Sequence, residues 1–380
     1  MSSALFTPIQ MRGLEMPNRI VVAPMCQYSA VDGTANDWHL MHLGQFAVAG
    51  NGLLLVEATG TEPEGRITPG CVGLWSDENE AGLKRVLDFC NAYGNTPVGI
   101  QLGHAGRKAS ADLPWNGGKP LSPDNGGWQT VGPSADAYAD GWHIPEAMTD
   151  ETLERVRVSF VEAAKRSVRL GFKAIELHNA HGYLLHQFLS PISNRRNDAY
   201  GGSLEGRMKY PLEIFNAVRD VVPDDIPVGV RISATDWVDG GWDIDGSTAY
   251  ANALHTAGCD FIDVSSGGNS PDQKIPVGPG YQTGFAAEIK RQTGMATMAV
   301  GKITDAVQAE HIVRSGQADM VALARGMLYD PHWAWHAAET LNAQTAFPPQ
   351  YQRCHPALAG EPVPGNPPSP EQVAKAAGKS

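Results

Sequence analysis

Short apolar runs recur eight times along the chain, and each has a length suited to one buried β-strand. One run contains Arg231, and a guanidinium buried inside a strand needs a partner because an isolated buried charge is very costly. The predicted strands span 19–23, 53–56, 97–102, 174–177, 228–232, 261–264, 297–300 and 320–323.

Helix-compatible segments separate these runs, and several carry terminal signals. Thr149 and the pair Thr304-Asp305 are typical helix starts, whereas glycines such as Gly171 and Gly294 follow helix ends. The predicted helices span 39–49, 80–93, 149–170, 204–221, 246–257, 283–292, 304–315 and 331–341. Eight strand–helix alternations favour parallel strands joined by crossover helices, closed into a (β/α)₈ TIM barrel.

The domain organisation follows from this pattern and from two irregular segments. We predict a single barrel domain over 1–355, followed by an irregular or disordered tail over 356–380 that contains the Pro/Gly-rich stretch 360–370. The segment 109–147, after the third strand, is long and rich in Gly, Pro and Trp. A loop of this length is usually functional, so we expect a lid or wall over the C-terminal ends of the strands.

Charge and cysteine usage narrow the possible partners. The net charge of −12 makes nucleic acid or an anionic membrane an improbable partner, and no apolar run approaches the roughly 20 residues that span a bilayer. The N-terminus lacks the basic and apolar regions of a signal peptide. Five scattered cysteines without a C-x-x-C pair argue against zinc, iron–sulfur and disulfide frameworks and predict a cytoplasmic protein.

Candidate chemistry gathers after the fourth predicted strand. His178, His181 and Tyr183 place two imidazoles and a phenol at the end of a strand, where barrels carry their active sites. A single histidine would more often only cap local backbone, but three proton-exchanging groups within six residues favour a site.

Other strand ends supply polar and cationic residues, with no obvious Asp or Glu among them. The absence of carboxylates argues against a two-carboxylate glycosidase and weakens a divalent-metal site. A His-x-x-His zinc hydrolase stays open, although no third ligand is evident. The residues in question are Cys26, Ala58, Gln101, His104, Lys108, Arg231, Gly301, Lys302 and Arg325.

The last two strand ends indicate a phosphate site. Gly301-Lys302 and Ala324-Arg325-Gly326 combine glycines, which let backbone N–H groups approach oxygens, with cations. The plainer alternative is a turn glycine and a surface arginine. Flavin mononucleotide (FMN) would explain both these ends and Arg231, because its ring edge gains negative charge on reduction.

At this point the chain resembles a known family. The segments NRIVVAPMCQYSA, DGTANDWH, QLGHAGRKAS, ELHNAHGYLLHQFLSP and SNRRNDAYGGSLEGR are similar to those of the old yellow enzymes, within the xenobiotic reductase and thermophilic-like branch. The resemblance runs over about 5–353. It implies an FMN-dependent NADPH dehydrogenase or ene-reductase that takes hydride from NADPH or NADH and reduces the C=C bond of α,β-unsaturated carbonyls, imides or nitro compounds.

The resemblance also implies roles for cofactor-binding residues. Cys26 would lie near the reactive edge of the flavin and tune its redox potential, Arg231 would stabilise the reduced ring, and Gln101 would contact the pyrimidine portion through its amide. Ring and phosphate contacts would further come from Ala23, Pro24, Met25, Ala58, Gly301, Ala324 and Arg325.

For the substrate, the resemblance implies that His178 and His181 hydrogen-bond its oxygen while the flavin N5 delivers hydride to the β-carbon. Tyr183 would protonate the α-carbon, and Tyr28 would line the cavity. Lys108 is typical of this branch beside the site, but no role follows for it.

Two departures and three alternatives accompany the resemblance. Gly206 replaces the usual asparagine of a structural turn, and Lys302 introduces a cation beside the phosphate site.

A homodimer or homotetramer is expected, with Arg353 reaching into a neighbouring active site. The alternatives are a metal-dependent hydrolase, an iron–sulfur flavin relative, which would need a cysteine cluster and a dinucleotide domain, and a non-catalytic flavin-binding protein.

Overall fold

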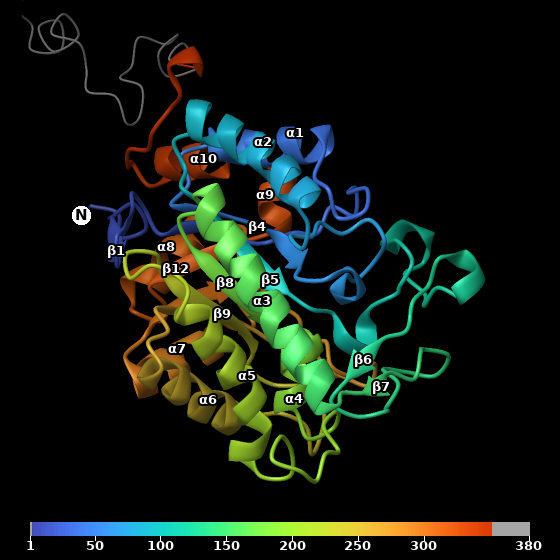
Figure 1. Cartoon of the computed structure of the whole chain (residues 1–380). Coiled ribbons are helices and arrows are strands. Elements are labelled where there is room, and N and C mark those ends of the chain that lie inside the picture. The colour runs from blue at the N-terminus through green and yellow to red at the C-terminus, as the bar shows by residue number, and fades with distance from the viewer. Residues whose placement is uncertain (1, 352–380) are drawn as a thin grey trace, which may run out of the picture.

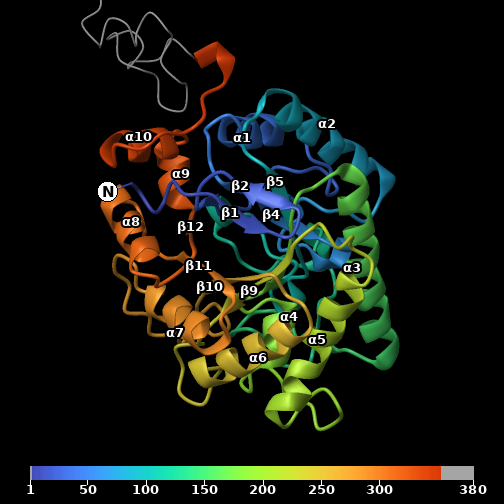
Figure 2. The ribbon, with the colours of Figure 1, turned by 90° about the vertical axis from the view of Figure 1, so that its left-hand side faces the viewer.

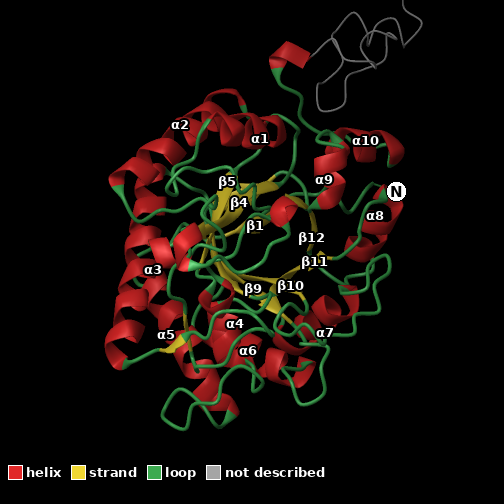
Figure 3. Ribbon diagram, turned by 90° about the vertical axis from the view of Figure 1, so that its right-hand side faces the viewer, coloured by secondary structure: helices red, strands yellow, loops and turns green. Residues whose placement is uncertain are grey.

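The computed structural model describes residues 2–351, and eight parallel strands close into a barrel within them (Figure 3). Each barrel strand pairs with its sequence neighbours, and the last strand returns to the first. The predicted (β/α)₈ fold is therefore confirmed. The strands are β3 (Ile20–Val22), β4 (Leu53–Gly60), β5 (Val98–Gly103), β8 (Ile175–Asn179), β9 (Val228–Ser233), β10 (Phe261–Ser265), β11 (Ala296–Val300) and β12 (Met320–Leu323).

β4 and β8 end at least two residues later than their apolar segments predict. β4 continues past Val56 to Gly60, because the less apolar residues there still pair with β5 across a shift in register between Val56 and Thr59. Ala58 consequently lies inside β4, and His178 lies inside β8, instead of after the strand ends.

The predicted helices surround the barrel, and their ends follow the capping signals. The Thr149 side chain accepts a hydrogen bond from the Thr152 N–H at the start of α3, and Gly171 ends that helix in the left-handed conformation. These helices are α1 (Asp37–Ala47), α2 (Asp77–Tyr93), α3 (Asp150–Leu170), α5 (Leu204–Arg219), α6 (Ile244–Thr256), α7 (Thr283–Thr293), α8 (Ala306–Arg314) and α10 (Trp333–Thr340). Two short helices were not predicted, α4 (Leu184–Leu189) and α9 (Arg325–Tyr329).

A hairpin that the pattern does not predict closes one end of the barrel. β1 (Ile9–Met11) and β2 (Leu14–Met16) pair antiparallel and lie across the mouth of the barrel in Figure 2. Met11, Leu14 and Met16 are buried against side chains from inside the barrel such as Leu55 and Phe261. The hairpin therefore plugs the N-terminal end and leaves the opposite end for a site.

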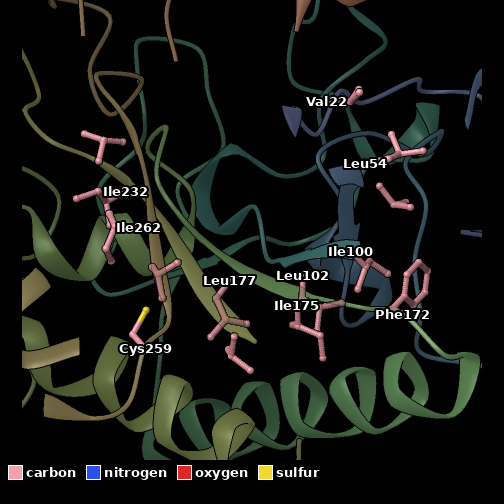
Figure 4. Packing of buried hydrophobic residues seen from close by; sticks show 14 of the residues in the cluster. Val22, Leu54, Ile100, Leu102, Phe172, Ile175, Leu177, Ile232, Cys259 and Ile262 are labelled. Carbon is pink, nitrogen blue, oxygen red and sulfur yellow. The ribbon is translucent and has the colours of Figure 1, made fainter. Parts of the chain in front are cut away.

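The main core lies between the barrel and the helices. Figure 4 shows Leu102, Ile175 and Leu177 pointing from their strands toward the helices that surround them. The alternate residues of the same strands face the barrel interior, as the two-residue period of a strand requires.

The long segment after β5 lies at the end of the barrel opposite the hairpin (Figure 1). It contains the short strands β6 (Val131–Gly132) and β7 (Glu146–Ala147). Single turns of 3₁₀ helix occur at η1 (Pro63–Gly65), η2 (Gly106–Lys108), η3 (Pro114–Asn116), η4 (Pro123–Asn125) and η5 (Pro349–Tyr351). The predicted tail over 356–380 and Arg353 lie outside the described residues.

Over residues 2–351, no helix combines the length and the apolar character needed to cross a bilayer.

Candidate active site

Two imidazole rings and a phenol ring meet at the C-terminal end of β8. The ring centroid of His178 lies 5.0 Å from those of both His181 and Tyr183, and the rings meet edge to face. Nε2 of His178 and Nδ1 of His181 are separated by 3.3 Å. A single oxygen atom that faces both nitrogens would therefore lie within hydrogen-bonding reach of each ring.

Neighbouring groups determine which nitrogen of each ring carries the proton. The Ala180 N–H donates to Nδ1 of His178 at 3.3 Å, which assigns the His178 proton to Nε2. Nε2 of His181 lies 2.7 Å from Oγ of Ser265, whose hydroxyl can donate as well as accept. When that hydroxyl donates, the His181 proton resides on Nδ1. Both N–H groups then face the same point.

Burial keeps these histidines neutral and the tyrosine protonated. Burial, followed by the positive charge of Arg231, holds the pKa of both histidines well below 6.5. Burial also raises the pKa of Tyr183 well above 10.0. Neutral N–H donors beside a protonated phenol suit a substrate whose oxygen gains charge while a nearby carbon takes up a proton.

A large cavity opens beside this cluster and is lined by cations. It has a volume of about 540 Å³, and its described wall contains Arg231, Lys302 and Arg325 but no Asp or Glu. Gly301 and Ala324 also line it. Gly301 has φ of +125°, and a Cβ there would lie 2.8 Å from the Gln282 side chain, so the backbone approaches as closely as only glycine allows.

The other predicted cofactor residues lie around the same barrel end, but not on that cavity wall. Ala58 lines a narrower cleft together with His178 and Tyr183. Gln101 is buried in β5, and its Nε2 donates to Oε1 of Glu176 at 2.7 Å, which leaves the amide oxygen for another partner. Ala23 is buried, whereas Pro24, Met25 and Cys26 are partly buried in the segment after β3.

Cys26 has a second thiol as its neighbour. A hydrogen bond with Cys71, followed by burial, raises the pKa of Cys26 well above 9.0, and the same bond lowers the pKa of Cys71. Cys26 is therefore a neutral thiol in this environment. Tyr28 follows in the left-handed conformation, with φ of 53°, and packs edge to face on Trp115 of the long segment at 6.0 Å.

Two acidic residues lie inside the barrel, before the strand ends that the sequence analysis considered. Glu176 of β8 and Asp263 of β10 are completely buried inside the barrel, and Asp263 Oδ2 lies 3.0 Å from Nε of Arg231. Burial raises the pKa of Glu176 to about 8 and also raises that of Asp263. A charged residue within an apolar run was the signal that identified Arg231, and the same signal in IELH and FIDVS would have identified both carboxyls.

Two residues at strand ends have other partners. Nε2 of His104 lies 3.0 Å from Oε1 of Glu62, whose other oxygen pairs with the exposed Arg155 at 2.5 Å, so this buried imidazole has a structural partner. Lys108 lies against Tyr183, with Nζ 5.1 Å from the centroid of the phenol ring. Within residues 2–351, no three His, Cys, Asp or Glu side chains gather in a way that could hold a metal ion.

The described residues fit a flavin mononucleotide. A dianionic phosphate matches the cavity wall formed by Arg325, Lys302 and the glycine backbone at Gly301. Arg231 reaches the same cavity from β9 while its Nε pairs with Asp263, so the other N–H groups of its guanidinium are available to a polar ring edge. Chemistry and placement therefore agree with the cofactor that the sequence predicts.

Comparisons with known proteins agree with this geometry. Residues 4–344 match the model of the NADH:flavin oxidoreductase / NADH oxidase family. An NADPH dehydrogenase of Geobacillus sp. is 42% identical over 355 residues, which cover 93% of this chain and 99% of that protein. An NADH:flavin oxidoreductase of Gibberella zeae is 44% identical over 348 residues, covering 87% of this chain and 84% of that protein.

Solved structures are similar as well. Morphinone reductase superposes with a TM-score of 0.76 at 27% identity, covering 92% of this chain and 91% of that one. A 2-naphthoyl-CoA reductase, solved with 2-naphthoyl-CoA, superposes with a TM-score of 0.80 at 25% identity. The match covers 89% of this chain but only 52% of that longer protein, so this chain spans about half of its length.

Proposed function

Because the chain belongs to the NADH:flavin oxidoreductase family, the old yellow enzymes, and is an oxidoreductase of the NADPH dehydrogenase type, we propose that it is an FMN-dependent ene-reductase. Its substrates are alkenes conjugated to a carbonyl, imide or nitro group. NADPH or NADH is the reductant. The two half-reactions alternate at one site, since both nicotinamide and alkene need the same face of the cofactor.

The observation that carries the proposal is the convergence of two ring nitrogens of neutral histidines beside a protonated phenol. Nε2 of His178 and Nδ1 of His181 lie 3.3 Å apart, and the Tyr183 ring lies 5.0 Å from that of His178. A carbonyl or nitro oxygen bound by both histidines draws electron density from the conjugated double bond. Donors aimed at an oxygen that gains charge are worth roughly 3 to 4 kcal/mol each in the reaction barrier.

FMN, when bound, supplies the hydride from its N5 atom. Arg325 and Lys302 would hold its phosphate, and Arg231 and Gln101 would face its ring, with the backbone of Gly301 and Ala324 close to the phosphate oxygens. Ala23, Pro24, Met25, Cys26 and Ala58 would complete the ring pocket.

Tyr183 holds the proton that the product needs. Burial keeps the phenol protonated at neutral pH, and its backbone N–H donates to the Ala180 carbonyl at 3.1 Å, which fixes the turn that orients it. A substrate whose oxygen lies on the histidine pair therefore presents its α-carbon to a proton donor of defined position. Tyr28 forms part of the wall on the side of the long segment.

We also propose a homodimer or homotetramer in which Arg353 of one subunit reaches the active site of another. This part of the proposal rests on the sequence alone.

An anaerobic titration tests the proposed function. The purified protein is expected to show flavin absorbance, NADPH should bleach it, and 2-cyclohexenone should restore it with one saturated ketone formed per flavin. Bleaching by NADPH without recovery by enones, maleimides or nitroalkenes would contradict ene-reduction while leaving the dehydrogenase activity in place. A colourless protein with bound zinc would contradict the flavin site itself.

A further inference from the structure

We infer that Lys108 is a positioning residue, which clamps the two turns that carry His181 and Gly268 and thereby holds His181 and Tyr183 in place for substrate. This inference rests on the function proposed above. It concerns a lysine that takes no part in the proton and hydride chemistry described so far.

Two backbone carbonyls converge on the lysine ammonium. Nζ of Lys108 donates to the carbonyl of His181 at 2.8 Å and to that of Gly268 at 2.7 Å. These carbonyls come from the turns after β8 and β10. Two carbonyl oxygens that point at one spot repel each other, and a shared cation turns that repulsion into two charge-assisted hydrogen bonds.

The two turns pack backbone against backbone, so they cannot relax apart without moving the site. A Cβ on Gly182 would lie 2.3 Å from the Gly268 carbonyl oxygen, and a Cβ on Gly268 would lie 2.6 Å from His181. The His181 N–H donates to Ser233 Oγ at 2.9 Å, and that hydroxyl donates to the Gly267 carbonyl at 2.8 Å.

The conformation of His181 itself needs support. Its φ is 59°, in the left-handed region that non-glycine residues rarely adopt, and such a residue persists only where its surroundings hold it. The Lys108 hydrogen bond to its carbonyl and the Ser233 hydrogen bond to its N–H fix the backbone on both sides of this residue.

The same ammonium contacts two aromatic rings. Nζ lies 5.1 Å from the centroid of the Tyr183 ring and 4.7 Å from that of Tyr138, which belongs to the long segment after β5. Arg107 supports this arrangement, since its Nη2 donates to the Asn269 carbonyl at 2.8 Å and its Nη1 to the Asp136 carbonyl at 3.4 Å. Lys108 thus links the phenol, the His181 turn, the Gly268 turn and the long segment.

The two hydrogen bonds that Lys108 donates do not require its positive charge. Burial, followed by the charge of Arg107, lowers the pKa of Lys108 to about 7, and the other titratable groups close to it are His178, His181, Tyr138 and Tyr183. A neutral amine still has two N–H donors, one for each carbonyl. The geometry of the turns therefore depends on the donors more than on the charge.

Lys108→Met and Lys108→Gln in the flavin-loaded protein separate the clamp from a space-filling role. Methionine has a similar length but no donor, whereas the glutamine amide keeps two N–H groups. Binding of 4-hydroxybenzaldehyde, followed by its long-wavelength charge-transfer absorbance, reports on the histidine pair. We expect about tenfold weaker binding in the Met variant, with flavin retained, and binding within about threefold of the original protein in the Gln variant.

The control is Lys119→Met, which removes an exposed lysine from the same long segment and should bind the phenol like the original protein. Unchanged phenol binding in Lys108→Met would overturn the inference. If the Met variant does not fold, the Gln variant decides, and loss of phenol binding with flavin still bound would overturn the clamp. Failure of the original protein to bind phenols would instead contradict the proposed function.

Discussion

At the scale of single residues, Tyr183 differs from the other tyrosines in what surrounds its ring. Its neighbours are His178, His181 and the ammonium of Lys108, and none of the hydrogen bonds found within residues 2–351 involves its hydroxyl. Tyr210, by contrast, donates its hydroxyl proton to the Leu153 carbonyl at 2.9 Å. A partly buried phenol whose hydroxyl makes no such structural bond is suited to give its proton to a substrate.

Tyr183→Phe should therefore slow enone reduction by about 10²-fold or more, the usual contribution of a positioned acid. Flavin binding and bleaching by NADPH should be unchanged, because neither needs this proton. Stopped-flow absorbance measures the two half-reactions separately. Tyr210→Phe is the control, and it should lower the free energy of unfolding by about 1 kcal/mol without slowing turnover. Equal oxidative rates in the original protein and Tyr183→Phe would remove the acid role from Tyr183.

Glu176 gives a second prediction at this scale, through the pH dependence of stability. Its pKa is about 8 in the folded protein, compared with about 4.3 in an unfolded chain. The folded state therefore binds a proton that the unfolded state lacks between these values, and stability falls as pH rises from about 4.3 to 8.

Glutamine does not titrate, so the stability of Glu176→Gln should lack the part of the pH dependence that comes from Glu176. Thermal unfolding of the flavin-loaded protein should show the Gln variant gaining stability relative to the original protein between pH 5 and pH 8. A constant difference in melting temperature over this interval would mean that Glu176 is already ionised at pH 5.

At the scale of elements, the turn after β8 depends on glycine. Gly182 has φ of +72°, and an added Cβ would meet the Gly268 carbonyl oxygen at 2.3 Å. Gly171, at the end of α3, has φ of +87° but nothing within 4 Å of an added Cβ. The two positions share the backbone requirement and differ in the space around it.

Gly171→Ala should cost about 1 kcal/mol in the free energy of unfolding, from the left-handed conformation alone. Gly182→Ala should cost more, and it should also weaken phenol binding because the turn that orients His181 and Tyr183 has to move. Denaturant unfolding and charge-transfer titration measure the two effects. Similar costs for both variants, with phenol binding intact, would show that the turn can accommodate the extra carbon.

Most strands and helices could be predicted from the sequence, and the exceptions have physical reasons. The eight barrel strands are buried on both faces, so most of them appear as continuous apolar runs and were predicted within a few residues. The hairpin β1–β2 was missed because its three-residue strands are too short for any period to appear. Helices α4 and α9 were missed because six and five residues are too few for an amphipathic pattern to be recognised.

The candidate site likewise contains residues that the sequence predicts and residues that it does not. The C-terminal ends of all barrel strands lie at one end of the barrel, so the sequence predicts that His178, Arg231 and Arg325 lie near one another. The structure places them around that end. Glu176 and Asp263 were overlooked because they lie within strands, a few residues before the ends that were searched. Their contact with Gln101 and Arg231 depends on strand pairing, which local patterns do not contain.

At the scale of the whole molecule, the barrel separates stability from function along its axis. The hairpin end is filled by apolar side chains, including the fully buried Met16 and Phe261. The opposite end presents Arg231, Lys302 and Arg325 to a cavity of about 540 Å³. Substitutions at the two ends should therefore have different consequences.

Met16→Ala removes a fully buried side chain at the hairpin end of the barrel and should lower the free energy of unfolding by about 2 to 5 kcal/mol. FMN affinity and enone turnover at 25 °C should stay unchanged. Arg325→Ala should have the opposite profile, because it removes a cation from the cavity wall and leaves the core intact. Its FMN dissociation constant should rise by about tenfold or more, with little change in the stability of the flavin-free protein. Fluorescence titration with FMN gives the dissociation constant of each variant, and denaturant unfolding gives its free energy of unfolding. A large loss of FMN affinity in Met16→Ala would mean that the apolar end positions the flavin pocket, and the separation along the barrel axis would not hold.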